Sequence, residues 1–185
     1  LKDFFQPDRI IIGLEDGDIK AKKMAKTLYR PLTNNEIPLI FTAPRNAEII
    51  KYASNAFLAT KISFSNELAD FCEQAGANIK EVMRGVGLDA RIGPEFLEAG
   101  IGFGGSCLPK DIDAFLEIGK EHGCSFPLLS AVKKNNQQRV DHFIKLLKKY
   151  LPTLKGKKIA LWGGAFKANT DDIREAPSLK IIAAL

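Results

Sequence analysis

Apolar and polar positions in the first 42 residues follow a strand–helix–strand order. Three isoleucines at 10–12 are followed by Gly13, which is typical of a short buried strand. Apolar residues recur near helical spacing over 16–29, with acidic residues early and lysines later, and Pro31 is expected to end that helix. A second apolar run at 37–41 predicts another strand. This order indicates the closing β-α-β part of an α/β domain.

One long helix is predicted over residues 46–75, where no proline or glycine interrupts the chain. Its apolar residues cover more than one stripe, and a helix that is apolar over most of its circumference is buried on several sides. Two interpretations stay open: a helix at the centre of the core, or a helix that also packs against a second copy of the chain.

The following residues are predicted to be helical around one conspicuous loop. The pattern Asn-x-x-Glu at 78–81 resembles a capping box, and Gly85 is expected to stop the short helix that it begins. A glycine-rich loop follows over 88–106. Further helices are predicted from Pro109 to Gly123, from Ser125 to Pro152 and from Pro177 to Leu185, with a strand at 158–162. The predicted fold class is therefore mostly α with flanking α/β pieces.

Composition and charge exclude several classes of protein. The chain has 185 residues, 45% hydrophobic and 26% charged, which excludes disordered and low-complexity proteins. No apolar run approaches the roughly 18–20 residues of a membrane helix. The three cysteines form no C-x-x-C pair and the two histidines are far apart. We therefore expect a reducing, cytoplasmic location, with no disulfide framework and no metal.

The net charge of +5 is concentrated in one basic stretch, 133–157, where only Asp141 opposes the lysines and arginine. Nucleic-acid binding would need stacking aromatic residues there, but Phe143 and Tyr150 fall on the apolar stripe of the predicted helix. We expect no nucleic-acid partner, and a small anionic ligand fits this mild charge better.

The two ends of the chain lack ordinary terminal signals. Residue 1 is leucine, and no signal-peptide pattern follows it. The last predicted helix reaches residue 185 without a cap or a glycine. We expect the chain to be the middle of a longer protein, so that any site in it is part of a larger one.

The segment with the clearest chemistry is Gly102–Asp111, which places Cys107 between a glycine loop and the start of a helix. The three glycines would leave backbone N–H groups free and let a ligand approach closely. The positive end of the helix and Lys110 favour the thiolate, the reactive form of cysteine. Cys72, in an apolar helix, and Cys124, without a comparable loop, lack this setting. The alternative for Cys107 is an inert thiol at a helix N-terminus.

Two further groups of polar residues could serve the same chemistry. Lys51 and Asn55 are one turn apart on the long helix and could stabilise negative charge developing on an oxygen. Asp111 lies one turn after Cys107 and could orient a water or a lysine. The alternatives are a lysine that reaches solvent, an asparagine that packs between helices and a carboxylate at a helix N-terminus.

A third candidate follows the predicted strand at 158–162. Ligands of open α/β sheets bind beyond the carboxyl ends of strands, and here an aromatic residue and two cations come next, Phe166, Lys167 and Arg174. Neither a G-x-G-x-x-G pattern nor a P-loop occurs. The alternative is an ordinary charged loop.

Four blocks together resemble the nucleotide-sugar dehydrogenases, the UDP-glucose/GDP-mannose dehydrogenase family. The cysteine block and the Phe-Lys…Arg-Glu block are specific when they occur together, and the likeness is greatest to members that oxidise UDP-glucose. The blocks follow the family's order and span essentially the whole chain: Pro7–Gly13, Lys51–Ala59 with Asn66 and Glu67, Gly102–Asp111, and Ala165–Ser178.

The resemblance implies a three-part enzyme that uses NAD. Residues 1–42 would be the end of an NAD-binding Rossmann domain, and 43–153 a central helical domain for catalysis and dimerisation. Residues 154–185 would begin a Rossmann-like domain that binds the nucleotide sugar. A homodimer through the helix at 46–75 is also implied.

The implied reaction is a two-step, four-electron oxidation of the sugar C6 alcohol to a carboxylate, from UDP-glucose to UDP-glucuronate. Cys107 would add to the aldehyde to give a thiohemiacetal, which is oxidised to a thioester and then hydrolysed. Lys51 and Asn55 would contact the reacting oxygen, and Asp111 would help to activate water.

The resemblance also implies binding roles. Lys110 and Arg174 would contact NAD, and Arg91 would reach the substrate site of a neighbouring subunit. The remaining residues that would hold the nucleotide sugar, together with Lys51 and Asn55, are Phe96, Leu97, Glu98, Ala99, Gly100, Gly104, Phe166 and Lys167.

The chain departs from the family pattern in what it contains. The NAD-binding glycine motif and a catalytic glutamate would precede Leu1, and most of the C-terminal domain would follow Leu185, so we expect the chain alone to be inactive. Trp162–Gly164 differs from the small apolar residues expected there.

Three alternatives to this function stay open: oxidation of GDP-mannose, oxidation of UDP-N-acetylmannosamine or another nucleotide sugar, and a non-catalytic helical dimerisation module.

Overall fold

The computed structural model describes residues 2–34 and 36–185, with side chains from residue 4 onward. By its internal contacts the chain divides into two compact units, Leu1–Ser54 and Asn55–Leu185. Each unit is described by itself. The mostly helical fold with a small parallel sheet confirms the predicted class.

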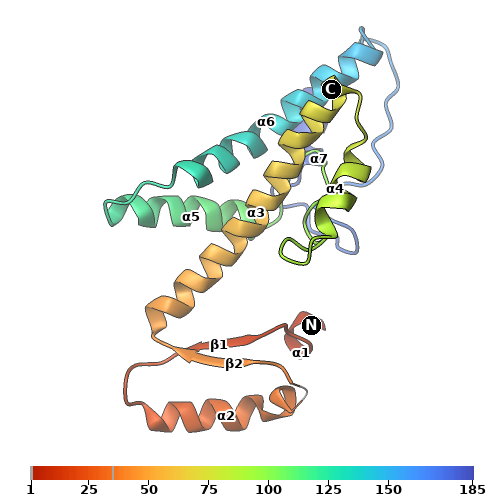
Figure 1. Ribbon diagram of the computed structural model, residues 1–185. Coiled ribbons are helices and arrows are strands. Elements are labelled where there is room, and N and C mark those ends of the chain that lie inside the picture. Colours follow the sequence, from red (N-terminus) through yellow and green to blue (C-terminus); the bar gives the residue numbers. More distant parts are fainter. Residues whose placement is uncertain (1, 35) are drawn as a thin grey trace. The chain divides into compact units, whose positions relative to one another are not determined.

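The first unit contains a parallel β-α-β arrangement (Figure 1). Strand β1 (Ile10–Gly13) pairs with β2 (Leu39–Thr42), with Ile10 opposite Leu39. Helix α2 (Ile19–Thr33) connects them, as parallel pairing requires. A short helix, α1 (Lys2–Phe5), precedes β1 and was not predicted.

Helix α2 differs from its prediction at both ends. It begins at Ile19, because the Asp18 side chain caps it by accepting a hydrogen bond from the Ala21 N–H at 2.8 Å. Pro31 lies inside the helix instead of ending it. The last turn continues to Thr33 because the carbonyl of Arg30 still accepts hydrogen bonds from the Thr33 hydroxyl and the Asn34 N–H.

Helix α3 (Pro44–Ala75) confirms the predicted long helix, with 32 residues and a length of about 48 Å at 1.5 Å per residue. Its first residues belong to the first unit and its remainder to the second. Most of its buried residues are small, which lets neighbouring helices approach its backbone. The buried positions are Ala59, Ser63, Ser65, Asn66, Ala69 and Cys72.

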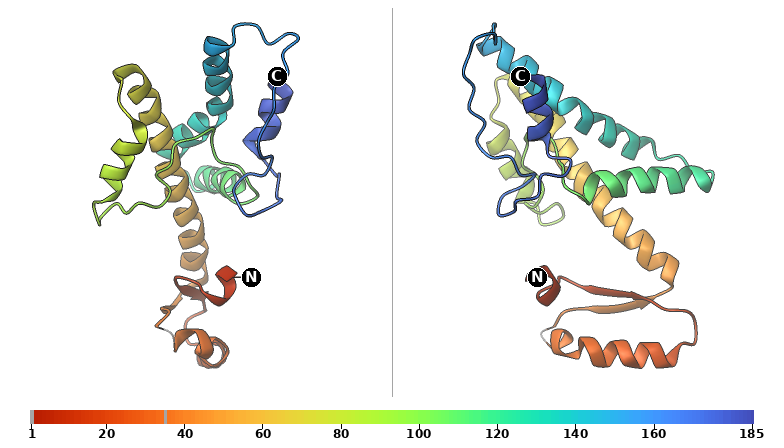
Figure 2. Two further views of the ribbon diagram at one scale, coloured as in Figure 1. Left: turned by 90° about the vertical axis from the view of Figure 1, so that its right-hand side faces the viewer. Right: turned by 180° about the vertical axis from the view of Figure 1, so that it is seen from behind.

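The second unit is helical around α3. Helices α5 (Leu108–Glu121) and α6 (Pro127–Tyr150) form a hairpin, and α7 (Pro177–Ala184) packs on α6 (Figures 1 and 2). The main buried cluster draws on α3, α5, α6 and one loop residue: Ala59, Phe103, Ile112, Leu129 and Val132. The core therefore fixes the loop that carries Phe103 as well as the helices.

Helix α4 (Ile79–Gly87) extends beyond its predicted end at Gly85. Its N-terminus is capped as predicted, with the Asn78 side chain accepting from the Lys80 N–H at 3.0 Å. The last turn forms because Gly87 is buried against Pro94, whose Cα would lie only 2.9 Å from a Cβ at position 87. This packing outweighs the low helix propensity of the two glycines.

The strand predicted at 158–162 is wrong. These residues are extended but belong to no sheet, they are exposed, and Trp162 is fully so. A strand needs a neighbouring backbone to hydrogen-bond, and in the described part of the chain the only sheet is the β1–β2 pair. The run of apolar residues therefore did not by itself decide the structure here. Among the described residues, no helix has both the length and the apolarity to cross a membrane.

Candidate active site

The N-terminus of α5 presents an exposed cysteine. Cys107 is the N-cap residue, and its carbonyl accepts a hydrogen bond from the Asp111 N–H at 2.8 Å. Pro109 in the first turn suits the helix start because proline needs no N–H partner there. The nearest polar side chain on the same loop is Ser106, whose Oγ lies 3.7 Å from the cysteine Sγ. The helix dipole therefore acts on an accessible sulfur.

A buried carboxylate one turn later joins α3 to α5. Asp111 is only 5% exposed, and its Oδ2 accepts a hydrogen bond from Asn55 Nδ2 at 2.6 Å. Its Oδ1 lies 2.9 Å from Lys110 Nζ. A buried charge needs such partners, so the two contacts fix the Asp111 carboxylate in one orientation. The structure thus brings Asn55 next to Asp111, which lies 56 residues further along the chain and follows the cysteine loop.

Lys51 lies one turn before Asn55 on α3 and is exposed. It belongs to the first compact unit, whereas Asn55 and Asp111 belong to the second. Its contribution to the site stays a prediction.

The glycine loop is pressed against the segment that precedes α7. The Gly105 N–H donates to the Arg174 carbonyl at 2.8 Å, and the φ of +83° at Gly105 favours glycine. A Cβ at Gly105 would lie 2.7 Å from the Phe166 ring, and one at Gly104 would overlap the Glu175 carbonyl. The amide of Gly105 is therefore already bonded, and the absence of a side chain at both glycines permits this close packing of the chain. The predicted contact of Gly104 with a ligand stays a prediction.

Arg174 brings a second cation to this loop. Its guanidinium binds Asp172 through two bonds, Nε to Oδ1 at 2.9 Å and Nη2 to Oδ2 at 2.6 Å. These hydrogen bonds lower the pKa of Asp172 to about 2. The hydrogen bonds and the charge of Asp172 also raise the pKa of Arg174. We had predicted Arg174 only as a cofactor residue, and the bond that ties its backbone carbonyl to the cysteine loop was missed.

Phe166 and Lys167 lie on the same segment. The Phe166 ring packs over Gly105, its N–H donates to the Asp172 carbonyl at 3.0 Å, and Lys167 Nζ lies 5.5 Å from the ring centroid. The Phe166–Arg174 candidate therefore adjoins the cysteine loop, a juxtaposition that the sequence separation of about 60 residues concealed.

The predicted sugar loop, Phe96–Gly100, has one strained residue and one buried one. Phe96 has a φ of +63°, an uncommon conformation for a bulky residue and one that recurs at functional sites. Leu97 is buried beside α4, whereas Glu98 is exposed. A cavity of about 550 Å³ adjoins this loop and is lined by Ile79, Lys80, Met83, Arg84, Pro94, Leu97, Glu98 and Ala99.

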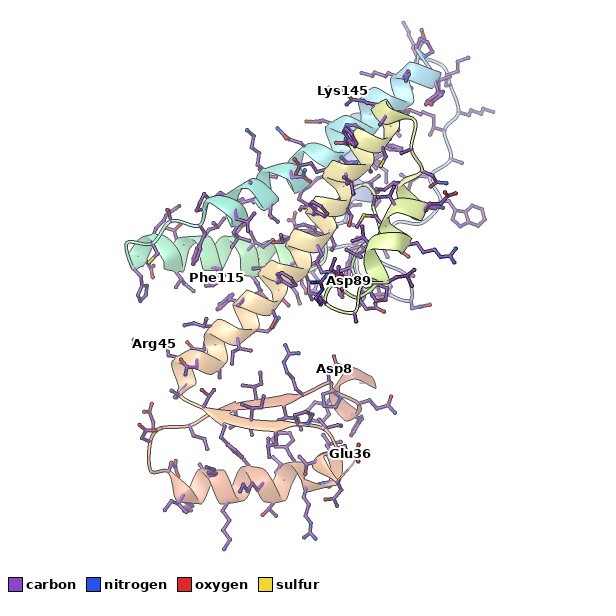
Figure 3. The ribbon with its side chains drawn as sticks, in the orientation of Figure 1. Asp8, Glu36, Arg45, Asp89, Phe115 and Lys145 are labelled. Carbon is purple, nitrogen blue, oxygen red and sulfur yellow. The ribbon has the colours of Figure 1, made fainter. Side chains whose placement is uncertain are left out.

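Arg91 is exposed and bound to its own loop. Its Nη2 lies 2.6 Å from Oδ2 of Asp89, which follows α4 (Figure 3). These hydrogen bonds hold the pKa of the Asp89 carboxyl below its usual value and raise that of Arg91. The predicted contact of Arg91 with a neighbouring subunit stays a prediction.

Three polar residues with buried or half-buried side chains were missed as part of the site. Asn66 accepts a hydrogen bond from the Gly100 N–H, Asn136 from the Phe103 N–H, and Arg139 reaches the Gly100 carbonyl. The sequence did contain a signal for two of them. Asn136 and Arg139 fall at positions of α6 that continue its buried apolar face, where an amphipathic helix normally carries hydrophobic residues. We had considered the surrounding basic stretch only for its charge.

Among residues 2–34 and 36–185, no group of three or more His, Cys, Asp or Glu side chains could hold a metal ion.

Two family models match the chain. The central domain of the UDP-glucose/GDP-mannose dehydrogenase family matches residues 45–138, and the UDP binding domain of that family matches residues 160–185. The described geometry around Asn55, Cys107 and Asp111 lies within the first of these matches.

Several known proteins are similar along the whole chain. A UDP-glucose 6-dehydrogenase of Rhizobium meliloti (strain 1021) is 45% identical over 100% of the chain, and one of Bacillus subtilis (strain 168) is 51% identical over 97%. The solved structure of a UDP-glucose dehydrogenase from the archaeon Pyrobaculum islandicum superimposes with a TM-score of 0.93 at 41% identity, over 100% of the chain.

A UDP-D-ManNAc dehydrogenase structure from Pyrococcus horikoshii is less similar, with a TM-score of 0.82 and 30% identity over 99% of the chain. In every case the chain spans less than half of the relative: 43%, 40%, 41% and 42% of their lengths, in the order given.

Proposed function

Because this chain belongs to the UDP-glucose/GDP-mannose dehydrogenase family, we propose that the full-length protein is an NAD-dependent UDP-glucose 6-dehydrogenase. The observation that carries the proposal is the exposed Cys107 at a helix N-terminus beside the 2.6 Å bond from Asn55 to the buried Asp111. The names of the relatives with 44–51% identity support UDP-glucose as the sugar. The product would be UDP-glucuronate, formed by two oxidations at C6.

Cys107 performs the covalent step in this proposal. Its thiolate sulfur bonds to the C6 aldehyde carbon, and the carbonyl oxygen takes a proton to give a thiohemiacetal. Loss of a hydride from C6 and of the hydroxyl proton leaves a thioester. Water then attacks the thioester carbon, the C–S bond breaks, and the carboxylate and the thiolate are released. NAD⁺, when bound, accepts one hydride in each of the two oxidations.

The residues around Cys107 orient the reacting groups. Asn55 is fixed by its bond to Asp111 and would direct its amide toward the oxygen on C6, with Lys51 adding positive charge one turn earlier on α3. Asp111 would hold the attacking water, because its carboxylate is buried and restrained by Asn55 and Lys110.

The cations of the site fit the phosphates of a dinucleotide. The side chains of Lys110 and Arg174 are 71% and 68% exposed, so each presents charge to solvent while one side is held by a carboxylate. We assign them to NAD, and the nucleotide sugar to Phe96–Gly100, Gly104, Phe166 and Lys167. We also propose that the NAD-binding domain ends at residue 42 and that the nucleotide-sugar-binding domain begins after residue 153. The three free cysteines fit a reducing compartment such as the cytoplasm.

The test is an assay of the full-length protein with NAD⁺ and three sugars in parallel: UDP-glucose, GDP-mannose and UDP-N-acetylmannosamine. We expect two NADH per UDP-glucose consumed and slow or no turnover of the other two. One NADH per sugar would contradict the double oxidation, and preference for another nucleotide sugar would overturn the proposed substrate.

We also propose that the protein is a homodimer through α3. Phe57, Phe64 and Phe71 recur every seven residues on this helix and are 66%, 54% and 65% exposed, a spacing that aligns them along one face. In such a dimer, Arg91 of one subunit would reach the substrate site of the other.

Light-scattering mass tests the dimer. Phe57→Glu and Phe64→Glu are each expected to shift the full-length protein from dimer to monomer, because a charge would be buried in the interface. Leu128→Glu, at an exposed position of α6, is the control and should leave the dimer intact. A wild-type protein that is already monomeric would rule the interface out.

A further inference from the structure

The segment from Gly100 to Phe103 joins the proposed sugar loop to the cysteine loop, and both of its ends are held by side chains from helices. At Gly100, the backbone N–H donates to Asn66 Oδ1 at 2.7 Å. The Gly100 carbonyl accepts a longer bond from Arg139 Nε at 3.4 Å. The two bonds tie this glycine to α3 on one side and to α6 on the other.

At Phe103, a single side chain satisfies both backbone groups. The Phe103 N–H donates to Asn136 Oδ1 at 2.8 Å, and Asn136 Nδ2 donates to the Phe103 carbonyl at 3.0 Å. This pair of bonds replaces the neighbouring strand that an extended segment would otherwise need. The Phe103 ring lies in the main buried cluster, so the backbone and the side chain are fixed together.

Gly102 shows how closely Asn136 approaches the loop. Its φ is +101°, and a Cβ at this position would lie 2.8 Å from Asn136 Oδ1. The glycine therefore accommodates the asparagine side chain, and the two residues depend on one another.

The holding side chains are buried or half-buried. Asn66 is 1% exposed and Arg139 is 8% exposed, and Asn136 is half-buried. The guanidinium of Arg139 is anchored in turn, because its Nη1 lies 2.7 Å from both carboxylate oxygens of Asp70 on α3. Burying these groups costs free energy unless they are bonded, so this network fixes one arrangement of the segment.

We propose that Asn136 and Arg139 of α6 are positioning residues for the two halves of the active site. Asn136 sets the position of the cysteine loop and hence of the Cys107 sulfur. Arg139, with Asn66, sets the position of the Phe96–Gly100 loop. The two α6 residues are three apart and share one face of the helix, so a single rigid element controls both loops. This inference rests on the proposed function for its kinetic consequences only.

The two residues predict different kinetic effects in the full-length protein. Asn136→Leu keeps the volume of the side chain but removes both bonds to Phe103. It is expected to lower kcat about tenfold and to leave KM within about twofold, because the nucleophile is displaced from the reacting carbon. Arg139→Lys keeps the charge opposite Asp70 but loses the planar fork. It is expected to raise KM about fivefold with kcat nearly unchanged. Gln138→Ala, an exposed amide of the same helix, is the control and should change neither.

Amide hydrogen exchange tests the holding of the segment independently of activity. We expect the Phe103 amide to exchange about fivefold to tenfold faster in Asn136→Leu, which removes its acceptor. In Arg139→Lys we expect a smaller acceleration, about twofold to threefold, at the Gly100 amide, because that amide keeps its bond to Asn66 and only the Gly100 carbonyl loses a donor. If wild-type protein oxidises no sugar, the proposed function fails, and the exchange rates still decide whether these residues hold the segment.

Two results would overturn the inference. One is a lower unfolding temperature for Asn136→Leu with unchanged kcat and unchanged Phe103 exchange, which means a purely structural role. The other is the same change in kcat and KM for both variants, which means that the two loops are not controlled separately. If Asn136→Leu does not fold, Asn136→Ser, which keeps an acceptor for the Phe103 N–H, takes its place with the same expected direction.

Discussion

The two ends of helix α5 each carry an exposed free cysteine, and their surroundings are opposite. Cys107 is the N-cap residue and lies at the positive end of the helix dipole. Cys124 follows the C-terminus and lies at the negative end of the same dipole. One helix thus places two chemically identical thiols in unlike fields.

The partners of the two ends differ even more than the dipole does. At the C-terminal end every contact is local: the Cys124 N–H donates to the Gly119 carbonyl, and Lys120 pairs with Glu117. At the N-terminal end, Asn55 and Arg174 come from positions more than 50 residues away along the chain. The two thiols therefore differ in whether distant segments of the chain pack beside their end of the helix.

The largest expected effect is a difference in enzymatic rate between the variants Cys107→Ser and Cys124→Ser. Cys107→Ser should lower formation of the uronic acid by the full-length protein at least about 10³-fold, because serine at neutral pH is a far weaker nucleophile than a thiolate. Cys124→Ser should leave the rate unchanged. The measurement is NADH release with UDP-glucose. Equal rates for both variants would remove the distinction between the two ends.

Glycines at the two ends of α5 should respond unequally to a methyl group. A Cβ at Gly104 would overlap the Glu175 backbone, which cannot turn aside, so Gly104→Ala should lower the free energy of unfolding by about 3 kcal/mol. A Cβ at Gly119 would meet the Phe126 ring at 2.7 Å, and that ring can shift.

Gly119→Ala should therefore cost about 1 kcal/mol or less, with part of the strain offset by the higher helix propensity of alanine. Denaturant unfolding of the two variants measures the difference. A larger loss for Gly119→Ala would show that the packing before α7 is not rigid.

The local signals of the sequence predicted most of the fold. The uninterrupted run before Gly76 gave α3, and the prolines at 109 and 127 marked the first turns of α5 and α6. The predictions that failed depended on partners far along the chain. Pro31 did not end α2, because the Arg30 carbonyl still accepts the helical bond from the Asn34 N–H. Residues 158–162 formed no strand, because among the described residues no strand lies beside them.

The candidate site was predictable to the extent that its chemistry is local. Cys107, with the glycine loop before it and a helix after it, was evident from spacing alone. The bond from Asn55 to Asp111 and the bond from the Gly105 N–H to the Arg174 carbonyl needed the tertiary fold. Asn136 was hidden because an amide within a basic helix gives no sign that it holds a loop backbone.

The rate of alkylation compares the reactivity of the thiols directly. In the folded full-length protein at pH 7, iodoacetamide should label Cys107 about tenfold faster than Cys124, although both are exposed. Cys72 is 3% exposed and should label only on unfolding. Mass spectrometry of the labelled peptides gives the three rates. Labelling of Cys107 no faster than Cys124 would show that the field at the N-terminus of α5 does not activate the sulfur.

The smallest expected effect is the pH dependence of the ion pairs near each end of α5. Near Cys107, Arg174 lowers the pKa of Asp172 to about 2, from an unfolded value of about 3.9. A lowered carboxyl pKa stabilises the fold above about pH 3.9, and this contribution is lost as the pH falls toward 2. Near Cys124, Glu117 raises the pKa of Lys120, so that pair stabilises the fold below the usual lysine pKa and is lost as the pH rises past the raised value.

Lys120, Glu117 and Arg174 are exposed and only Asp172 is partly buried, so each pair should shift the unfolding midpoint only slightly. The stability difference between wild type and Asp172→Asn should shrink between pH 4 and 2, and that between wild type and Glu117→Gln should shrink as Lys120 loses its proton under alkaline conditions. Thermal unfolding of the three proteins across pH measures both. A difference for Asp172→Asn that grows on acidification would mean that the carboxylate is not held by Arg174, and the cation assigned to the Cys107 end of α5 would then be free to turn away from it.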